Sequence, residues 1–129
     1  MPLRSLRVSL VVAVAVLAMS AGVSAAGGVV GSYSTTVKSP AQLKGKWVIT
    51  FAKGGSYSVA LNGQTVAHGR YASTASTITL DRERGSACTG KGTYAWKKSG
   101  TTVTFTRKRE SVSCQARAAV LAHRFTQVR

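Results

Sequence analysis

The stretch LKGKWVITFAKGGSYSVALNG, residues 43–63, decides the fold. Its apolar residues stand at every second position in two runs, which are Trp47, Ile49, Phe51 and then Tyr57, Val59, Leu61. This period of two is typical of strands that bury one face. Glycines separate the two runs, and Asn62-Gly63 after the second run is the strongest short hairpin signal in the chain. The stretch therefore predicts two antiparallel strands joined by tight turns.

The alternation continues further along the chain. Three more pairs follow it, which are Ile78 and Leu80, Tyr94 and Trp96, and Val103 and Phe105. Residues 64–72, QTVAHGRYA, allow two phases: either Val66, His68 and Arg70 face inward, or Thr65, Ala67, Gly69 and Tyr71 do. We favour the second phase, because burying an unpaired Arg is costly. His68 is then an exposed strand residue.

The end of the domain has a different pattern. Val112, Ala116, Ala119 and Val120 fall at helical spacing, which predicts a short helix over about 113–121, capped by Ser111 or Ser113. A last strand is expected within residues 123–128. A meander of six or seven strands with one oily face must cover or close its edges. The sequence thus predicts an all-β fold, a small antiparallel up-and-down barrel with a short C-terminal helix.

The N-terminal residues predict export. Residues 1–25 combine Arg4 and Arg7 with the apolar run of residues 10–19 and a small-residue cleavage site ending at Ala25. An uncleaved anchor is the alternative, although the run is short for a membrane span. We expect a signal peptide over 1–25, a flexible tether over 26–42 and a barrel domain over 43–129. The protein is then secreted or held at the cell surface.

The two cysteines predict a disulfide. In an exported chain, Cys88 and Cys114 form a disulfide more often than a metal site. A zinc site would need His68 and His123 as well, without the usual close spacing. In the loop-entropy model the bridge stabilises the fold by about 3.5 kcal/mol.

A resemblance to known proteins rests on several motifs together. Gly45-Lys46-Trp47, the string ACTGKGTYAW at 87–96 and CQAR at 114–117 resemble a family of small secreted bacterial proteins of the lipocalin-like (calycin) type. The resemblance covers about residues 43–121. It implies that Trp47 closes one end of the barrel, that Gly45 lets the chain pass beneath it, and that an Arg packs on the indole. Arg117 is the favoured candidate, with Arg124 as the alternative. The family pattern is often acidic before the second Cys, whereas this chain has RKRES.

The barrel interior is the first candidate site. The predicted ligand-lining residues are Phe51, Tyr57, Val59, Tyr71, Ile78, Tyr94, Trp96 and Phe105. A barrel of this size holds one small apolar ligand or is filled by its own side chains. The second reading remains open, because the strands are short and the inner residues are large.

The charge suggests a second role. The chain carries 18 Lys and Arg against 3 acids, and loss of Arg4 and Arg7 would leave 16 against 3, a net charge of +13. A solvated basic surface and a surface that binds an anionic wall polymer, a lipid headgroup or an acidic protein are both consistent with this. Nucleic acid is the less favoured partner. Asp81 and Glu83 lie among arginines in DRERG, which indicates a solvated, salt-bridged turn. No catalytic motif is present, so we expect a monomeric, non-enzymatic protein without cofactor or metal.

Overall fold

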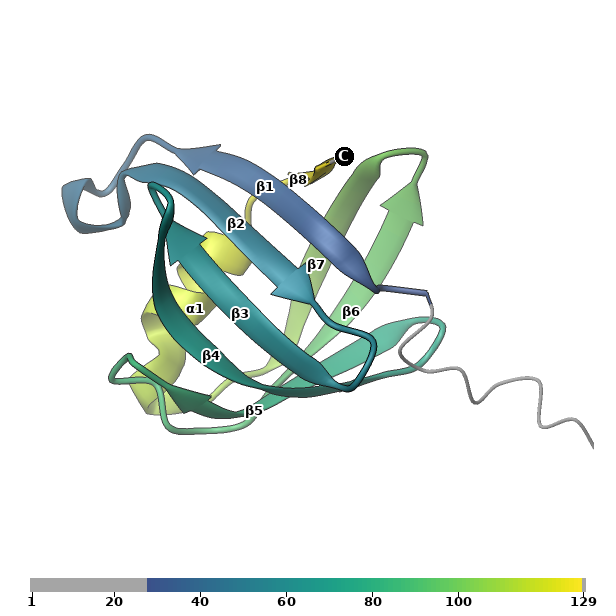
Figure 1. Ribbon diagram of the computed structural model, residues 1–129. Coiled ribbons are helices and arrows are strands. Elements are labelled where there is room, and N and C mark those ends of the chain that lie inside the picture. Colours follow the sequence, from purple (N-terminus) through teal and green to yellow (C-terminus); the bar gives the residue numbers. More distant parts are fainter. Residues whose placement is uncertain (1–27, 129) are drawn as a thin grey trace, which may run out of the picture.

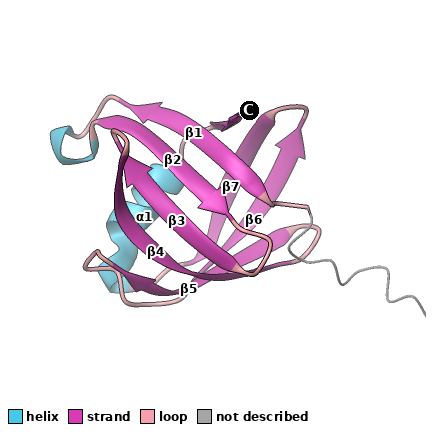
Figure 2. Ribbon diagram, in the orientation of Figure 1, coloured by secondary structure: helices cyan, strands magenta, loops and turns pink. Residues whose placement is uncertain are grey.

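The computed structural model describes residues 28–128, and these form a closed antiparallel barrel. Each strand pairs with the next one along the chain, and β8 returns to pair with β1 (Figure 1). The strands are β1 Gly31–Val37, β2 Gly45–Phe51, β3 Ser56–Leu61, β4 Gln64–Ser73, β5 Thr77–Arg84, β6 Gly92–Ser99, β7 Thr102–Arg109 and β8 Phe125–Val128. The predicted up-and-down barrel with a short C-terminal helix is confirmed (Figure 2). The expected signal peptide, residues 1–25, lies outside the described residues.

The expected tether over 26–42 is wrong for residues 31–37, which form β1. Tyr33 and Val37 point into the barrel and are 0% and 1% exposed. The strand pairs with β2 along its whole length, from Gly31 opposite Phe51 to Val37 opposite Gly45. Two apolar side chains in a small, hydroxyl-rich segment give a weak pattern, but β1 supplies the strand that joins β2 to β8. The domain therefore begins before Leu43, and the barrel has one strand more than the meander that the sequence indicated.

Strand β4 confirms the favoured phase over most of its length. Ala67, Gly69 and Tyr71 are buried, and His68 is exposed. Thr65 is exposed too, contrary to expectation, because a bulge changes the phase of the strand. Val59 pairs with Ala67 while the next residue pairs with Thr65, so Val66 has no partner and turns its side chain partly inward.

Aromatic rings fill one part of the barrel. Phe51 is 1% exposed, and its ring centroid lies 5.0 Å from that of Tyr71, 6.1 Å from that of Tyr33 and 6.3 Å from that of Phe105. Phe105 in turn packs edge-on against Phe125 of β8. Such ring pairs add to the stabilisation that comes from burying apolar area. This part of the interior is therefore packed.

The C-terminal helix confirms its expected place. The 3₁₀ turn η2, Val112–Cys114, leads into α1, Gln115–Leu121, and β8 then completes the barrel. The expected serine cap is wrong: Ser111 Oγ instead donates to the carbonyl of Lys91, and neither helix start has a side-chain cap. Val120 and Leu121 are buried, whereas Val112 is 91% exposed. No helix within residues 28–128 has the length and apolar character that crossing a membrane requires.

Candidate functional site

A cavity of about 270 Å³ occupies the other part of the barrel interior, beside α1. Its walls are mostly apolar and come from β2 to β5 and the helix. The apolar lining residues are Trp47, Ile49, Tyr57, Val59, Leu61, Val66, Ala67, Leu80, Ala87, Ala116, Val120 and Leu121. Trp47 Nε1 donates to the carbonyl of Leu43 at 2.7 Å, so the polar atom of the indole is satisfied by the backbone. The cavity can therefore accommodate an apolar molecule or the apolar part of one.

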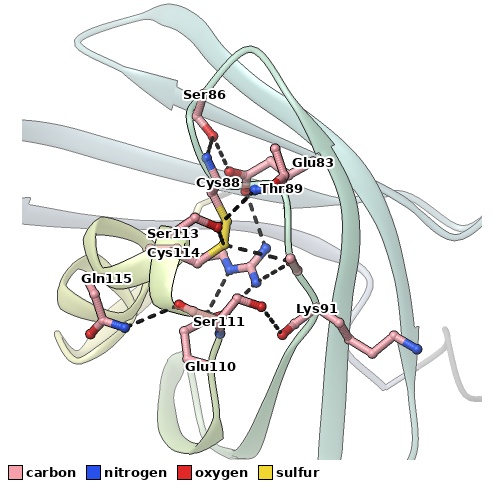
Figure 3. The surroundings of a disulfide bond; sticks show 12 residues. Glu83, Ser86, Cys88, Thr89, Lys91, Glu110, Ser111, Ser113, Cys114 and Gln115 are labelled. Atoms are coloured by element: carbon pink, nitrogen blue, oxygen red, sulfur yellow. Dashed lines mark hydrogen bonds and ion pairs between the residues drawn. A yellow bond between two sulfur atoms is a disulfide. The ribbon is translucent and has the colours of Figure 1, made fainter.

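The mouth of the cavity lies between the segment after β5 and the start of α1. The exposed lining residues are Gly85, Ser86 and Ala87 on one side and Ser113 and Ala116 on the other. The disulfide between Cys88 and Cys114, with Cα atoms 4.5 Å apart, joins these two sides (Figure 3). The predicted cysteine pairing is confirmed, and the bridge fixes the helix against the rim.

One side of the cavity carries a buried ionic cluster, which comprises Arg117, Glu110 and Glu83. Arg117 Nε donates to Glu110 Oε2 at 2.9 Å, and Nη2 donates to Glu110 Oε1 at 2.6 Å and to the carbonyl of Gly90 at 2.9 Å. Glu83 lies next to the third guanidinium nitrogen, with 3.8 Å between Arg117 Nη1 and Glu83 Oε1. The side chains of Arg117, Glu83 and Glu110 are 6%, 5% and 1% exposed. Buried charges of this kind are tolerated only when they are paired.

Tyrosine and serine hydroxyls complete the cluster. Tyr57 donates its hydroxyl to Glu83 Oε1 at 2.8 Å, and Ser86 donates to Glu83 Oε2. Tyr94 donates to Glu110 Oε2. Both carboxylates thus receive donors on both oxygens, with the backbone N–H of Ser111 added at Glu110. Figure 3 shows Glu83 and Ser86 close to the disulfide, with Glu110 on its other side.

The surroundings of Tyr57, Tyr94 and Glu110 shift the pKa of each of these groups. Burial raises the pKa of Tyr57 well above its ordinary value, and the neighbouring Glu83 carboxylate raises it further. Burial and the hydrogen bond to Glu110 likewise raise the pKa of Tyr94. Burial alone would raise the pKa of Glu110, but the hydrogen bonds from Arg117, Tyr94 and the Ser111 backbone outweigh it and leave that pKa below its ordinary value.

The expectation that DRERG is a solvated turn is wrong for Glu83. At a bulge in β5, two residues, Arg82 and Glu83, lie opposite the single residue Gly69 of β4. Arg82 adopts a positive φ of 53°. The extra residue shifts the alternation set by Ile78 and Leu80, so Arg82 points outward and Glu83 inward.

Of the eight predicted lining residues, the cavity receives only Tyr57 and Val59. Five of the others are buried in the packed core instead: Phe51, Tyr71, Ile78, Tyr94 and Phe105. Trp96 is half-buried, and its indole donates to the carbonyl of Thr74 at 2.9 Å. Period-two alternation identifies inward-facing residues, but it does not tell which end of the barrel is filled.

The residues chosen from the family resemblance are placed differently from expectation. Gly45, with φ 141°, begins β2, and a methyl group on it would lie 2.7 Å from Asn62 Oδ1, so the close passage of the chain at this position is real. The Gly-x-Trp motif starts the second strand and not the first. Trp47 forms part of the cavity wall. The contacts of Arg117 in the described chain are to the two glutamates and Gly90, and stacking on Trp47 is not found among them.

The remaining predicted sites stay apart. His68 is exposed on β4, His123 bonds through Nδ1 to the carbonyl of Ala119, and both cysteines are used by the disulfide. Sequence reasoning missed the Arg117–Glu110–Glu83 cluster. The chain has only three acidic residues, and this scarcity is the sequence signal that could have pointed to the cluster. Two of the three, Glu83 and Glu110, are buried beside Arg117.

Comparisons with known proteins give no relative: no protein family, no curated protein and no solved structure matches the chain.

Proposed function

We propose that the protein is an exported binding protein that takes a small apolar molecule into the barrel cavity. The observation that carries this proposal is the cavity itself, about 270 Å³ with mainly apolar walls. Binding pockets for small molecules span about 300–1,000 Å³ with a few polar groups, so this cavity lies just below that range. The aromatic rings around Phe51 fill the other part of the interior, so open space is not a general feature of this barrel.

Binding fits the polar groups of the cavity better than catalysis does. The hydroxyls of Tyr57 and Ser86 are engaged with the Glu83 carboxylate, and Glu110 is engaged with Arg117. Among residues 28–128, no group of three or more His, Cys, Asp or Glu is placed to hold a metal ion.

Tryptophan fluorescence can test ligand binding. The chain has two tryptophans; Trp47 lines the cavity and Trp96 does not. In a Trp96→Phe protein, emission comes from the cavity wall alone. Titration with an apolar compound of about nine non-hydrogen atoms should give a saturable change in this emission.

A matched pair of variants distinguishes cavity binding from surface adsorption. Val59→Phe, in the Trp96→Phe background, fills the cavity and should abolish the saturable change. Val48→Phe makes the same substitution on the neighbouring strand, at a half-buried position outside the cavity lining, and should leave the change intact. Equal titration curves for both variants would refute binding in the cavity.

Export and the lipocalin-like resemblance belong to the same proposal. The Cys88–Cys114 bridge suits an oxidising compartment, and the closed up-and-down barrel supports the resemblance, whereas the start of Gly-x-Trp at the second strand does not. The N-terminal residue of the protein recovered from the culture medium or cell surface tests export. We expect Ala26, whereas recovery of the full chain in the cytoplasm would argue against export.

A second candidate function rests on the distribution of charge. Because Glu83 and Glu110 are buried, Asp81 is the one acid left near the surface of residues 28–128, and every Lys and Arg there except Arg117 is exposed. Such a surface attracts polyanions. The partner would be an anionic wall polymer, a lipid headgroup or an acidic protein.

Retention on an anionic polymer tests this second candidate. Replacing Arg107, Lys108 and Arg109 by Glu should weaken retention at low salt more than replacing Lys44, Lys46 and Lys53 if β7 carries the contact. Retention that does not fall with rising salt would contradict a charge-driven mechanism.

A further inference from the structure

The guanidinium of Arg117 has one nitrogen without a hydrogen-bond partner among residues 28–128. Its Nε and Nη2 are used by Glu110 and Gly90, whereas Nη1 is fully buried and makes no hydrogen bond to this part of the chain. The Glu83 Oε1 atom lies 3.8 Å from Nη1, which is beyond hydrogen-bond length. An unpaired buried donor costs free energy. An oxygen supplied by another molecule would remove that cost.

Glu83 offers the matching acceptor. Its Oε1 accepts one hydrogen bond, from Tyr57, and a carboxylate oxygen can accept two. Arg117 and Glu83 both line the cavity, so a donor and an acceptor 3.8 Å apart belong to residues in the wall of an otherwise mostly apolar space. One oxygen can lie within about 3 Å of both atoms.

The charges of the cluster limit the chemistry of the bound group. Arg117 faces two carboxylates, Glu110 and Glu83, so the cluster carries one net negative charge in a buried place. A ligand carboxylate would add a second negative charge where water screens poorly. An ammonium group could donate to Glu83 but offers no acceptor to Nη1 and would lie beside the guanidinium. A hydroxyl both accepts and donates, and it is neutral.

We propose that the ligand is a neutral alcohol whose hydroxyl accepts from Arg117 Nη1 and donates to Glu83 Oε1, with its hydrocarbon part in the cavity. This inference rests on the proposed function, because it needs an apolar ligand in the same cavity. At about 30 Å³ for each non-hydrogen atom, the cavity holds roughly nine such atoms. Octan-1-ol has that size and is a suitable probe.

Four probes of nearly equal length test the proposal in the Trp96→Phe protein at neutral pH: octan-1-ol, octanoate, octylammonium and nonane. We expect octan-1-ol to bind about five- to tenfold more tightly than nonane, through the added hydrogen bonds, and at least tenfold more tightly than octanoate. Octanoate or octylammonium binding as tightly as the alcohol would overturn the proposal.

Glu83→Gln supplies the diagnostic variant. It removes the net negative charge while keeping the shape of the side chain. Octanoate should therefore gain affinity, and the preference for octan-1-ol over octanoate should shrink to threefold or less. Asp81→Asn removes a negative charge from the same strand, at a residue outside the cavity lining, and it should keep the wild-type order of the four probes. Thermal unfolding of each variant checks that it is folded.

The possible failures are distinguishable. If no probe binds with saturation, the proposed function itself fails. If nonane binds and Val59→Phe abolishes its binding, but the alcohol gains nothing over nonane, the cavity proposal holds and the hydroxyl site is wrong.

Discussion

Arg117 and Glu110 form a two-point ion pair that joins α1 to the end of β7, with Nη2–Oε1 at 2.6 Å and Nε–Oε2 at 2.9 Å. The Glu110 side chain is 1% exposed. A planar guanidinium matches a carboxylate in this arrangement better than a lysine does. The pair holds the helix in the position where it forms one wall of the cavity.

Removing the guanidinium should destabilise the fold strongly. In Arg117→Met, Glu83 and Glu110 both remain buried without a cation, and breaking a buried pair in this way costs about 3–5 kcal/mol. Urea unfolding at neutral pH measures the change. Arg124→Met, at an exposed arginine between α1 and β8, should change stability by less than about 0.5 kcal/mol. Similar losses in the two variants would show that the buried pair has no special role.

Stability should decrease in acid because of Glu110. Its pKa is held below the ordinary value in the folded protein, so its contribution is complete above the unfolded pKa of about 4.3 and is lost as the pH falls through the lower folded pKa. Urea unfolding from pH 7 to pH 2 should show this decrease. Glu110→Gln should flatten it and Asp81→Asn should not. An unchanged acid limb in Glu110→Gln would assign the effect elsewhere.

Gly92 on β6 gives the ion pair the space it needs. A methyl group there would lie 2.5 Å and 2.6 Å from the two Glu110 carboxylate oxygens and 2.7 Å from Arg117 Nη2. Gly92→Ala should therefore displace the pair and destabilise the fold by the roughly 1–3 kcal/mol typical of overpacking, which lowers the melting temperature by about 4–8 °C for each kcal/mol. Gly54→Ala, where a methyl meets nothing within 4 Å, is the control. Equal melting temperatures for Gly92→Ala and Gly54→Ala would mean that the Arg117–Glu110 pair can move without loss of stability.

Phe51 should be the most sensitive position of the packed aromatic part. Truncation to Ala removes a fully buried ring that packs against Tyr33, Tyr57, Tyr71 and Phe105 and should cost about 3–5 kcal/mol. Val112→Ala, at a position 91% exposed, should cost almost nothing. A loss below about 1 kcal/mol in Phe51→Ala would indicate that the rings are loosely packed.

The disulfide should stabilise both the fold and the rim of the cavity. Replacing Cys88 and Cys114 by Ser opens a loop with a sequence separation of 26, which the loop model values at about 3.5 kcal/mol. Denaturant unfolding measures the loss, and the effect of a reductant on the wild type should match it. A double variant as stable as the wild type would contradict the entropic estimate.

Alternation of apolar residues was enough to predict the closed meander. Helical spacing predicted the short helix, and the presence of two cysteines in a chain expected to be exported predicted the disulfide. Strand β1 escaped prediction because only Tyr33 and Val37 mark it as buried. Its partner β2 is recognisable on its own, so the missing information is the pairing between them, which no local pattern contains.

The ionic cluster escaped prediction because two bulges change the phase of their strands. Continuing the alternation from Leu80 would bury Arg82, and continuing it from Phe105 would bury Arg107. The bulge in β5 leaves Arg82 exposed and brings Glu83 inward, and the bulge after Arg107 in β7 brings Glu110 inward. The rule that disfavours a buried, unpaired Arg, which settled the phase of β4, is consistent with the exposure of both arginines. What it could not give is the meeting of the two acids at Arg117, which depends on where α1 packs.

Xenon binding in crystals of the protein shows whether the barrel holds an open apolar cavity, because xenon enters such cavities and reports their position. We expect a xenon atom inside the barrel, in contact with Ile49, Leu80 and Leu121, and no xenon there in Val59→Phe crystals. A barrel whose side chains close over this space, with no xenon in the interior, would contradict the proposal that the protein binds a ligand there.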